Sequence, residues 1–152
     1  MVGVIVVLTG MPGAGKSTVG RLLAARLGAA FHDLDARLAA ADPASRPAAR
    51  ILAEDGEPAF RAAEADAVRA LAGELGDAGR GAAGRVSVVV ATGGWTMGDP
   101  ASRRAIEALG PVVCLTAAPA TLAARLRPTA GDRPLLPRPD EGSLAALLAA
   151  RR

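Results

Sequence analysis

Short apolar runs alternate along the chain with longer segments whose apolar positions recur at helical spacing. The runs that we expect to form strands lie at 2–8, 29–32, 86–91 and 111–116. Helices are expected at 19–27, 36–41, 59–75, 100–109 and 119–126, with a last one after Ser143. The first run is apolar on both faces, which is typical of a central parallel strand. Strands that alternate with helices predict a parallel sheet covered on both faces, with ligands at the carboxyl ends of its strands.

Glycine, proline and aspartate residues predict several boundaries of these elements. Gly28 is expected to end the first helix, Pro58 to lie in the first turn of the helix 59–75, and Asp99 to cap the next helix. Loops or irregular segments are expected at 42–47, at the glycine-rich stretch 76–84 and at the proline-rich stretch 127–140.

The stretch Gly10-Met11-Pro12-Gly13-Ala14-Gly15-Lys16-Ser17 matches the phosphate-binding pattern G-x-x-x-x-G-K-[ST], and Thr18 adds a second hydroxyl. It lies between a predicted strand and a predicted helix, which is the context that the pattern requires. Backbone amides of such a loop, together with a helix N-terminus, surround an anion. We therefore assign triphosphate binding to Gly13, Ala14, Gly15, Lys16, Ser17 and Thr18, with Lys16 near the β- and γ-phosphates and Ser17 as a ligand of Mg²⁺. The alternative is a glycine-rich turn without a ligand.

Composition narrows this interpretation. Lys16 is the only lysine, so the chain uses arginine everywhere else and keeps a compact ammonium group at the phosphate loop. With 51% apolar and only 2% aromatic residues among 152, the composition predicts one domain with a core of Leu, Val, Ile and Ala.

The net charge is +3, the arginines are scattered, and we expect neither nucleic-acid nor membrane binding. Cys114, the only cysteine, is expected to be buried, and a cytoplasmic location is expected.

Two absences favour a small-molecule kinase over other phosphate-loop proteins. The run Val88–Thr92 ends without the magnesium-binding aspartate of motor ATPases and GTPases. A guanine-specific Asn-Lys pair is impossible, because Lys16 is the only lysine.

A set of ordered motifs resembles the shikimate kinase family over nearly the whole chain. It comprises Asp33-x-Asp35, Gly56-Glu57-x-x-Phe60-Arg61-x-x-Glu64, Gly93-Gly94 and Arg133-Pro134-Leu135-Leu136. The resemblance implies a P-loop NTPase-type three-layer α/β/α domain that phosphorylates the 3-hydroxyl of shikimate with ATP and Mg²⁺. The substrate-binding helical region would be about 33–75 and the lid about 127–140.

For the phosphoryl transfer itself, the resemblance implies that Asp33 helps to hold Mg²⁺ and that Asp35 orients or deprotonates the acceptor hydroxyl. Arg133 would close with the lid onto the transferred group, where positioning and charge neutralisation carry catalysis. An arginine stacks on adenine in the family; Arg125 is the better match, and Arg127 is the other candidate. From the residues alone, the two aspartates could equally be solvated turn carboxylates and Arg133 a solvated loop residue.

For the acceptor, the resemblance implies that Arg61 binds the substrate carboxylate and that Glu64 holds Arg61 in place. Phe60 would pack beside the ring of the substrate. Without the resemblance, Arg61 and Glu64 would read as an ordinary surface ion pair one helical turn apart. Gly93 and Gly94 would bring backbone amides close to the substrate, or simply form a turn.

The chain departs from the family pattern in two places. Trp95 stands where the family usually has a third glycine, so it either packs beside the substrate or marks a rebuilt loop. The family strand order 2-3-1-4-5 continues past Arg152, the position of the second carboxylate-binding arginine, so we expect the fifth strand to be missing. A monomer is expected, with a dimer across the open sheet edge as the alternative. The rival functions are a gluconate-type or other sugar-acid kinase and a nucleotide-binding homologue without catalysis.

Overall fold

In the computed structural model, which describes residues 4–78, 86–126 and 146, four parallel strands form one sheet. The strands are β1 (Val4–Gly10), β2 (Ala30–Asp33), β3 (Val86–Ala91) and β4 (Val112–Leu115), and their order is β2-β3-β1-β4. Every pairing is parallel, so all four carboxyl ends lie at one edge. The predicted parallel sheet is confirmed, and its order matches the expected order 2-3-1-4 among the described strands.

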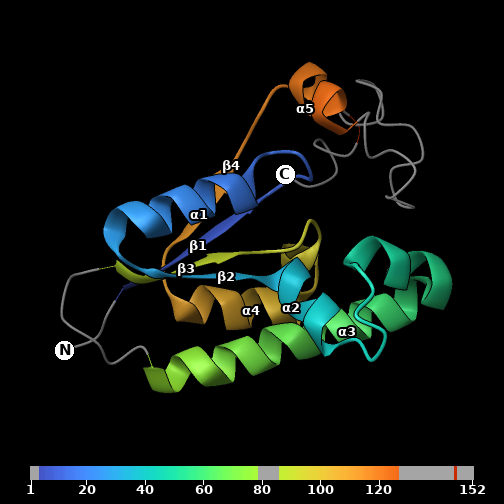
Figure 1. Cartoon of the computed structure of the whole chain (residues 1–152), viewed down its shortest axis with the longest axis horizontal. Coiled ribbons are helices and arrows are strands. Elements are labelled where there is room, and N and C mark those ends of the chain that lie inside the picture. The colour runs from blue at the N-terminus through green and yellow to red at the C-terminus, as the bar shows by residue number, and fades with distance from the viewer. Residues whose placement is uncertain (1–3, 79–85, 127–145, 147–152) are drawn as a thin grey trace.

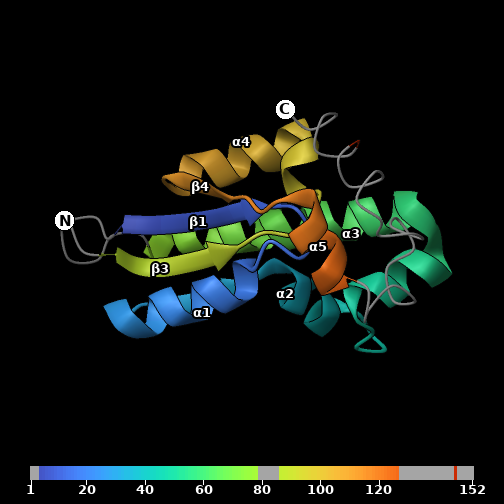
Figure 2. The same ribbon diagram turned by 90° about the horizontal axis from the view of Figure 1, so that it is seen from above.

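Helices cover both faces of this sheet (Figures 1 and 2). Helix α1 (Lys16–Leu27) lies on one face, and α3 (Ala48–Ala78) and α4 (Pro100–Leu109) lie on the other. Buried aliphatic side chains join each layer to the sheet: Val68, Leu71 and Ile106 pack against β1 and β3, and Ala24 packs against the opposite face. The three-layer α/β/α architecture is therefore confirmed, with the predicted aliphatic core.

Two short helices lie where the strands end. Helix α2 (Leu34–Ala41) directly follows β2, and α5 (Pro119–Leu126) lies beyond β4 (Figure 1). Because the phosphate-binding motif also follows a strand, this edge of the sheet gathers the residues that carry the chemistry.

Most predicted boundaries agree with the structure. Strand β3 and helix α5 have the predicted bounds, and Gly28 ends α1 in the left-handed conformation. The Asp99 carboxylate accepts a 2.7 Å hydrogen bond from the backbone N–H of Ser102, which confirms it as the cap of α4. β1 runs two residues further than expected, to Gly10.

The long helix α3 differs from the sequence prediction. Helical structure begins at Ala48, before the predicted start near Pro58, and it continues to Ala78, so the predicted connector at 76–84 starts too early. Gly56 interrupts the helix with φ 82° and ψ 168°. Pro58 then lies in the first turn after the break, where a missing N–H costs no hydrogen bond.

Cys114 is exposed, so the prediction of a buried thiol was wrong. It lies in β4, an outer strand of the sheet that pairs with β1. In this strand Val112 and Leu115 pack on the core, whereas Val113 is 45% exposed. An unbroken apolar run indicates burial on both faces in a central strand, but not in a strand at the edge of the described sheet.

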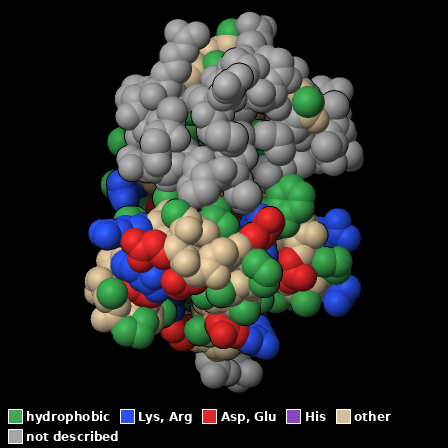
Figure 3. Space-filling model, turned by 90° about the vertical axis from the view of Figure 1, so that its right-hand side faces the viewer, with side chains coloured by type: hydrophobic (Ala, Val, Ile, Leu, Met, Phe, Trp, Pro, Cys, Tyr) green, Lys and Arg blue, Asp and Glu red, His purple; other side chains and the backbone are tan. Residues whose placement is uncertain are grey.

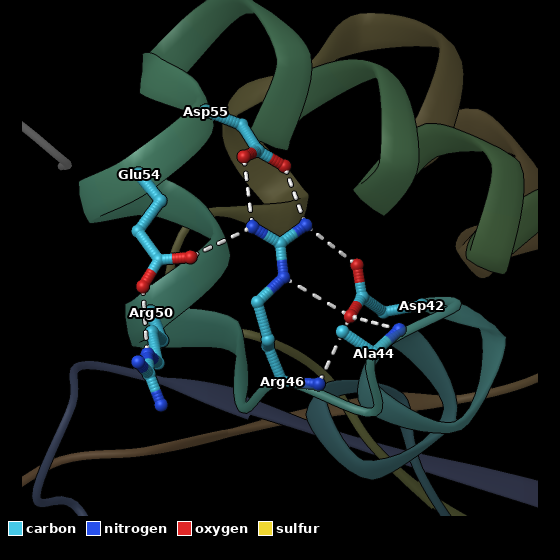
Figure 4. Close-up of polar contacts among 6 residues, drawn as sticks. All are labelled: Asp42, Ala44, Arg46, Arg50, Glu54 and Asp55. Atoms are coloured by element: carbon cyan, nitrogen blue, oxygen red, sulfur yellow. Dashed lines mark hydrogen bonds and ion pairs between the residues drawn. The ribbon is translucent and has the colours of Figure 1, made fainter.

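Arg46 links the predicted loop 42–47 to the first half of α3 through hydrogen bonds and ion pairs (Figure 4). Its guanidinium donates hydrogen bonds to Asp42 at 2.7 Å, Asp55 at 2.7 Å and Glu54 at 3.0 Å. Hydrogen bonds from the side chain and backbone of Arg46 lower the pKa of Asp42 to about 2. The contacts therefore tie α2, the loop and α3 into one connected unit beside the strand ends.

Charge is mixed on the described surface. Figure 3 shows acidic and basic side chains interspersed over the described part of the face where α2 and the beginning of α3 lie.

Within 4–78 and 86–126, no helix is long and apolar enough to cross a membrane.

Several predicted features lie outside the described residues. They are Arg127, the lid residue Arg133, the terminal Arg152, most of the connector 76–84, the segment 127–140 and the helix expected after Ser143.

Candidate active site

The phosphate loop has the backbone that anion binding requires. Gly13 and Gly15 adopt φ values of 81° and 97°, a region that favours glycine. Gly15 is the N-cap of α1, and no side chain caps this helix or adds an acid to its first turn. The positive end of the helix dipole is therefore left to a ligand, and an anion suits it.

Lys16 and Arg125 place two cations on this loop. The Lys16 ammonium donates to the carbonyl oxygens of Gly10 at 2.8 Å and Met11 at 3.1 Å. Arg125, in the last turn of α5, donates to the carbonyl of Gly13 at 3.0 Å. The structure thus brings Arg125 to the nucleotide side of the site.

Ser17 and Asp33 meet at the beginning of α1 and the end of β2. The Ser17 hydroxyl donates a 2.6 Å hydrogen bond to Asp33 Oδ2. The other carboxylate oxygen, Oδ1, accepts from the backbone N–H groups of Asp35 and Ala36, which caps α2. Asp33 therefore caps α2 and also contacts Ser17, the other residue predicted to hold Mg²⁺.

A cavity of about 500 Å³ opens beside the loop. Its lining comprises residues 12–19, Asp35, Thr92, Gly94 and Arg125. The cavity thus joins the phosphate loop to the carboxylate predicted to act on the acceptor. Its size suits a small organic ligand.

Thr92 lines this cavity at the end of β3, in the place where the sequence lacks the magnesium-binding aspartate. Its side chain is buried, and its Oγ1 has no hydrogen-bond partner among the described residues. A buried hydroxyl without a partner costs free energy, so its position at a ligand cavity is evidence for a role in binding. Sequence reasoning missed Thr92, although the missing aspartate marked its position.

Gly93 allows two carboxylates to converge. A Cβ atom at this position would lie 2.7 Å from Glu64 Oε1 and 3.0 Å from Asp35 Oδ1. A side chain at position 93 would displace these carboxylates from their present places, so the glycine keeps the two groups close together. At Gly94, a Cβ atom would lie 2.9 Å from Pro12 Cγ, so this segment also packs against the phosphate loop.

Arg61 lies between carboxylates that hold its guanidinium. Its Nη1 donates to Glu64 Oε2 at 3.0 Å, and its Nε and Nη2 donate to Glu57 Oε1 at 3.3 and 3.1 Å. Glu64 is buried and also accepts a 2.8 Å hydrogen bond from the Thr96 hydroxyl. Glu64 is therefore a buried partner of Arg61, and the two residues do not form the ordinary surface ion pair that is expected without the resemblance.

The aromatic residues complete this second part of the site. The Arg61 Cζ lies 5.4 Å from the centroid of the Phe60 ring and 5.2 Å from that of Trp95. Phe60 is buried with Leu38 and Ile51, so it supports Arg61 from the helical layer. Thr96, which sequence reasoning did not single out, links this part of the site to the turn after β3.

Together these residues define a class of protein. A phosphate loop with its lysine, a hydroxyl–carboxylate pair beside it, and a second carboxylate and an anchored arginine nearby belong to a P-loop kinase of small molecules.

The comparisons with known proteins identify the family. A family model described as shikimate kinase matches residues 12–152. A shikimate kinase of Symbiobacterium thermophilum is 45% identical over 97% of this chain and 78% of the relative, and one of Geobacter metallireducens is 41% identical over 97% and 74%. A solved shikimate kinase from Acinetobacter baumannii in complex with shikimate superposes with a TM-score of 0.81 at 30% identity, covering 98% of this chain and 76% of that one. The chain belongs to the shikimate kinase family.

Family membership confirms the predicted resemblance and the enzyme class: the protein is a kinase with ATP as phosphoryl donor. Within the described residues, no group of three or more His, Cys, Asp or Glu side chains forms a metal site of protein ligands alone.

Proposed function

We propose that this kinase transfers the terminal phosphoryl group of ATP to the 3-hydroxyl of shikimate, forming shikimate 3-phosphate for aromatic amino acid biosynthesis. The observation that carries the proposal is the convergence of Asp35 and Glu64 at Gly93. Asp35, which would act on the acceptor hydroxyl, lines the phosphate cavity, and Glu64 accepts a hydrogen bond from Arg61, which would bind the acceptor carboxylate. A small ring with one hydroxyl and one carboxylate matches these two groups.

On the nucleotide side, the loop amides of residues 13–18 and the Lys16 ammonium would bind the phosphates. Arg125, held at the Gly13 carbonyl, is positioned to lie against the base. The oxygens of Ser17 and Asp33 would suit a hard divalent cation. The Thr92 hydroxyl, which has no hydrogen-bond partner among the described residues, adds an oxygen at the cavity that Ser17 also lines. When bound there, Mg²⁺ would neutralise charge on the transferred phosphoryl group.

On the acceptor side, Asp35 would accept a hydrogen bond from the 3-hydroxyl and align its oxygen with the γ-phosphorus. As the oxygen–phosphorus bond forms, the bond to the β–γ bridging oxygen breaks, ADP leaves, and the hydroxyl proton passes to Asp35. Arg61 would bind the substrate carboxylate through two N–H groups. Phe60, Gly93 and Gly94 would enclose the ring.

Other roles rest on the sequence resemblance. Arg133 would close onto the transferring group with the lid, and Arg152 would be the second arginine on the substrate carboxylate. We further propose one domain over residues 1–152, a monomer and a cytoplasmic location.

A coupled ADP-release assay with Mg²⁺-ATP and shikimate, gluconate or no acceptor tests this function. We expect release that depends on shikimate, and a loss of about 10²–10⁴-fold in kcat for Asp35→Asn because the general base is removed. ATP affinity, measured by calorimetry, should stay within about twofold of the parent. Full activity of Asp35→Asn would refute the assigned role.

The same assay separates the rival functions. Release with gluconate alone would leave a kinase and replace the acceptor. ATP binding without stimulation by any acceptor would support a nucleotide-binding homologue that lacks catalysis.

A further inference from the structure

Trp95 contacts the arginine that is proposed to bind substrate. Its ring centroid lies 5.2 Å from Arg61 Cζ, within the range of about 6 Å in which a guanidinium and an aromatic face attract each other. The family resemblance predicts a third glycine here, and this chain has an aromatic side chain in its place. The indole is 37% exposed, so it also offers a surface to a ligand.

The contact complements the hydrogen bonds of Arg61. Glu64 accepts from Nη1 of the guanidinium, whereas Trp95 and Phe60 contact it through their rings. The hydrogen bond to the buried Glu64 fixes where this nitrogen lies, and ring contacts limit how the guanidinium plane tilts. Both restraints are needed for two parallel hydrogen bonds to a substrate carboxylate.

The turn that carries Trp95 is itself fixed. A Cβ atom at Gly98 would lie 2.5 Å from Trp95 Cε2 and 2.7 Å from its Nε1, so the indole rests directly on this glycine. The Gly98 N–H donates a 2.7 Å hydrogen bond to the Trp95 carbonyl, closing the 3₁₀ turn Thr96–Gly98. Thr96 of the same turn holds Glu64. One short segment therefore restrains Arg61 both directly and through Glu64.

We propose that Trp95 is a positioning and specificity-determining residue of the acceptor site. It keeps the Arg61 guanidinium oriented toward the carboxylate of a cyclic hydroxy acid and presents an apolar indole face to the ring of that acceptor. This inference rests on the proposed function, because it assumes that Arg61 binds the acceptor carboxylate.

The sequence supplies a direct probe. Trp95 is the only tryptophan, and the chain has no tyrosine, so its fluorescence reports this one place. We expect shikimate to change that fluorescence in the parent protein with the same dissociation constant that calorimetry gives. No change at saturating shikimate would overturn the placement of Trp95 at the acceptor.

Variants test the positioning role. Trp95→Gly should raise both the KM and the calorimetric Kd for shikimate by about 2- to 10-fold, with KM for ATP unchanged. Trp95→Phe, which keeps an aromatic face, should recover most of the loss. In the background of Arg61→Lys, which lacks the planar fork, Trp95→Gly should have little further effect.

The outcomes separate this inference from the proposed function. If the parent releases no ADP with shikimate, the proposed function fails whatever Trp95 does. If the parent is active but Trp95→Gly keeps the parental KM and Kd, or if the losses of Trp95→Gly and Arg61→Lys simply add, the inference alone is wrong.

Discussion

Ser17 and Asp33 are joined by a 2.6 Å hydrogen bond although the strands that lead to them, β1 and β2, do not pair with each other. Ser17 follows β1 and Asp33 ends β2, and β3 lies between these strands. The contact is possible because the carboxyl ends of parallel strands meet at one edge, where the first turn of α1 leans toward β2. The same carboxylate caps α2, so it serves both the fold and the proposed metal site.

Two substitutions at Asp33 should separate these roles. Asp33→Asn keeps a good N-cap, so the free energy of unfolding should stay nearly unchanged, whereas kcat should fall at least about 10-fold and the Mg²⁺ concentration for half-maximal activity should rise. Asp33→Ala should lose activity and also about 1 kcal/mol of stability. Urea unfolding and Mg²⁺ titrations of activity measure both. Equal stability loss in the two variants would contradict the separation.

Glu57 and Glu64 should have opposite effects on acceptor binding. Glu57 is exposed and accepts from Nε and Nη2 of Arg61, the edge that a substrate carboxylate would occupy. Glu57→Gln should therefore remove a competitor and lower KM for shikimate by about 2- to 3-fold. Glu64→Gln should raise KM at least about 10-fold, because a buried, doubly bonded anchor is lost. Initial rates at varied shikimate provide the test, and a rise of KM in Glu57→Gln would reject the competition.

Replacing Thr92 by valine should raise the stability of the protein and lower its activity. Its buried hydroxyl has no partner among the described residues, so Thr92→Val should raise the free energy of unfolding by up to about 1 kcal/mol. If the hydroxyl serves the bound nucleotide and Mg²⁺, kcat should fall by about 10-fold in the same variant. Thr92→Ser keeps the hydroxyl and should keep the activity. Unchanged kcat and KM in Thr92→Val would leave the hydroxyl without a catalytic role.

The Arg46 contacts should make stability depend on acidic pH. The folded protein lowers the pKa of Asp42 from 3.8 to about 2, chiefly through the Arg46 side chain, and Arg46 contributes to lowering the pKa of Asp55 as well. A lowered carboxyl pKa stabilises the folded state above pH 3.8, and this contribution is lost as the pH falls from about 3.8 toward 2. Arg46→Gln should lower Tm by about 2–4 °C at pH 7 and by less near pH 2.

Arg50→Gln is the matched control for this experiment. The side chain of Arg50 is 68% exposed, and its ion pair among the described residues is with Glu54. Thermal unfolding at pH 7, 4 and 2.5 should show a smaller change than for Arg46→Gln. A pH-independent loss in Arg46→Gln would show that packing of its side chain, rather than charge, stabilises the loop.

The sequence predicted those parts of the fold and site that depend on local patterns. The phosphate loop, the bounds of β3, the cap at Asp99 and the pair Arg61–Glu64 each lie within a few consecutive residues or one helical turn. Hydrophobic periodicity and motif spacing contain this information directly. The family resemblance added the strand order 2-3-1-4, which the described strands follow.

The contacts that were missed join segments far apart in the chain. Thr96 reaches Glu64 across 32 positions, and Trp95 meets Arg61 only because the turn after β3 lies beside the part of α3 that follows Gly56. The exposure of Cys114 likewise depends on the place of β4 in the strand order, which its own apolar sequence does not contain. Tertiary packing, and not local preference, decides such cases.

The two positions after Gly93, Gly94 and Trp95, differ in the side chains that they can accommodate. At Gly94 any side chain would press on Pro12, so an altered acceptor preference acquired there would disturb nucleotide binding at the same time. At position 95 the side chain rests on Gly98 and contacts Arg61 instead. Substitutions that change which acceptor is used should therefore accumulate at position 95, whereas Gly93 and Gly94 should stay glycine. Selection of variant libraries on new acceptors would reveal this constraint.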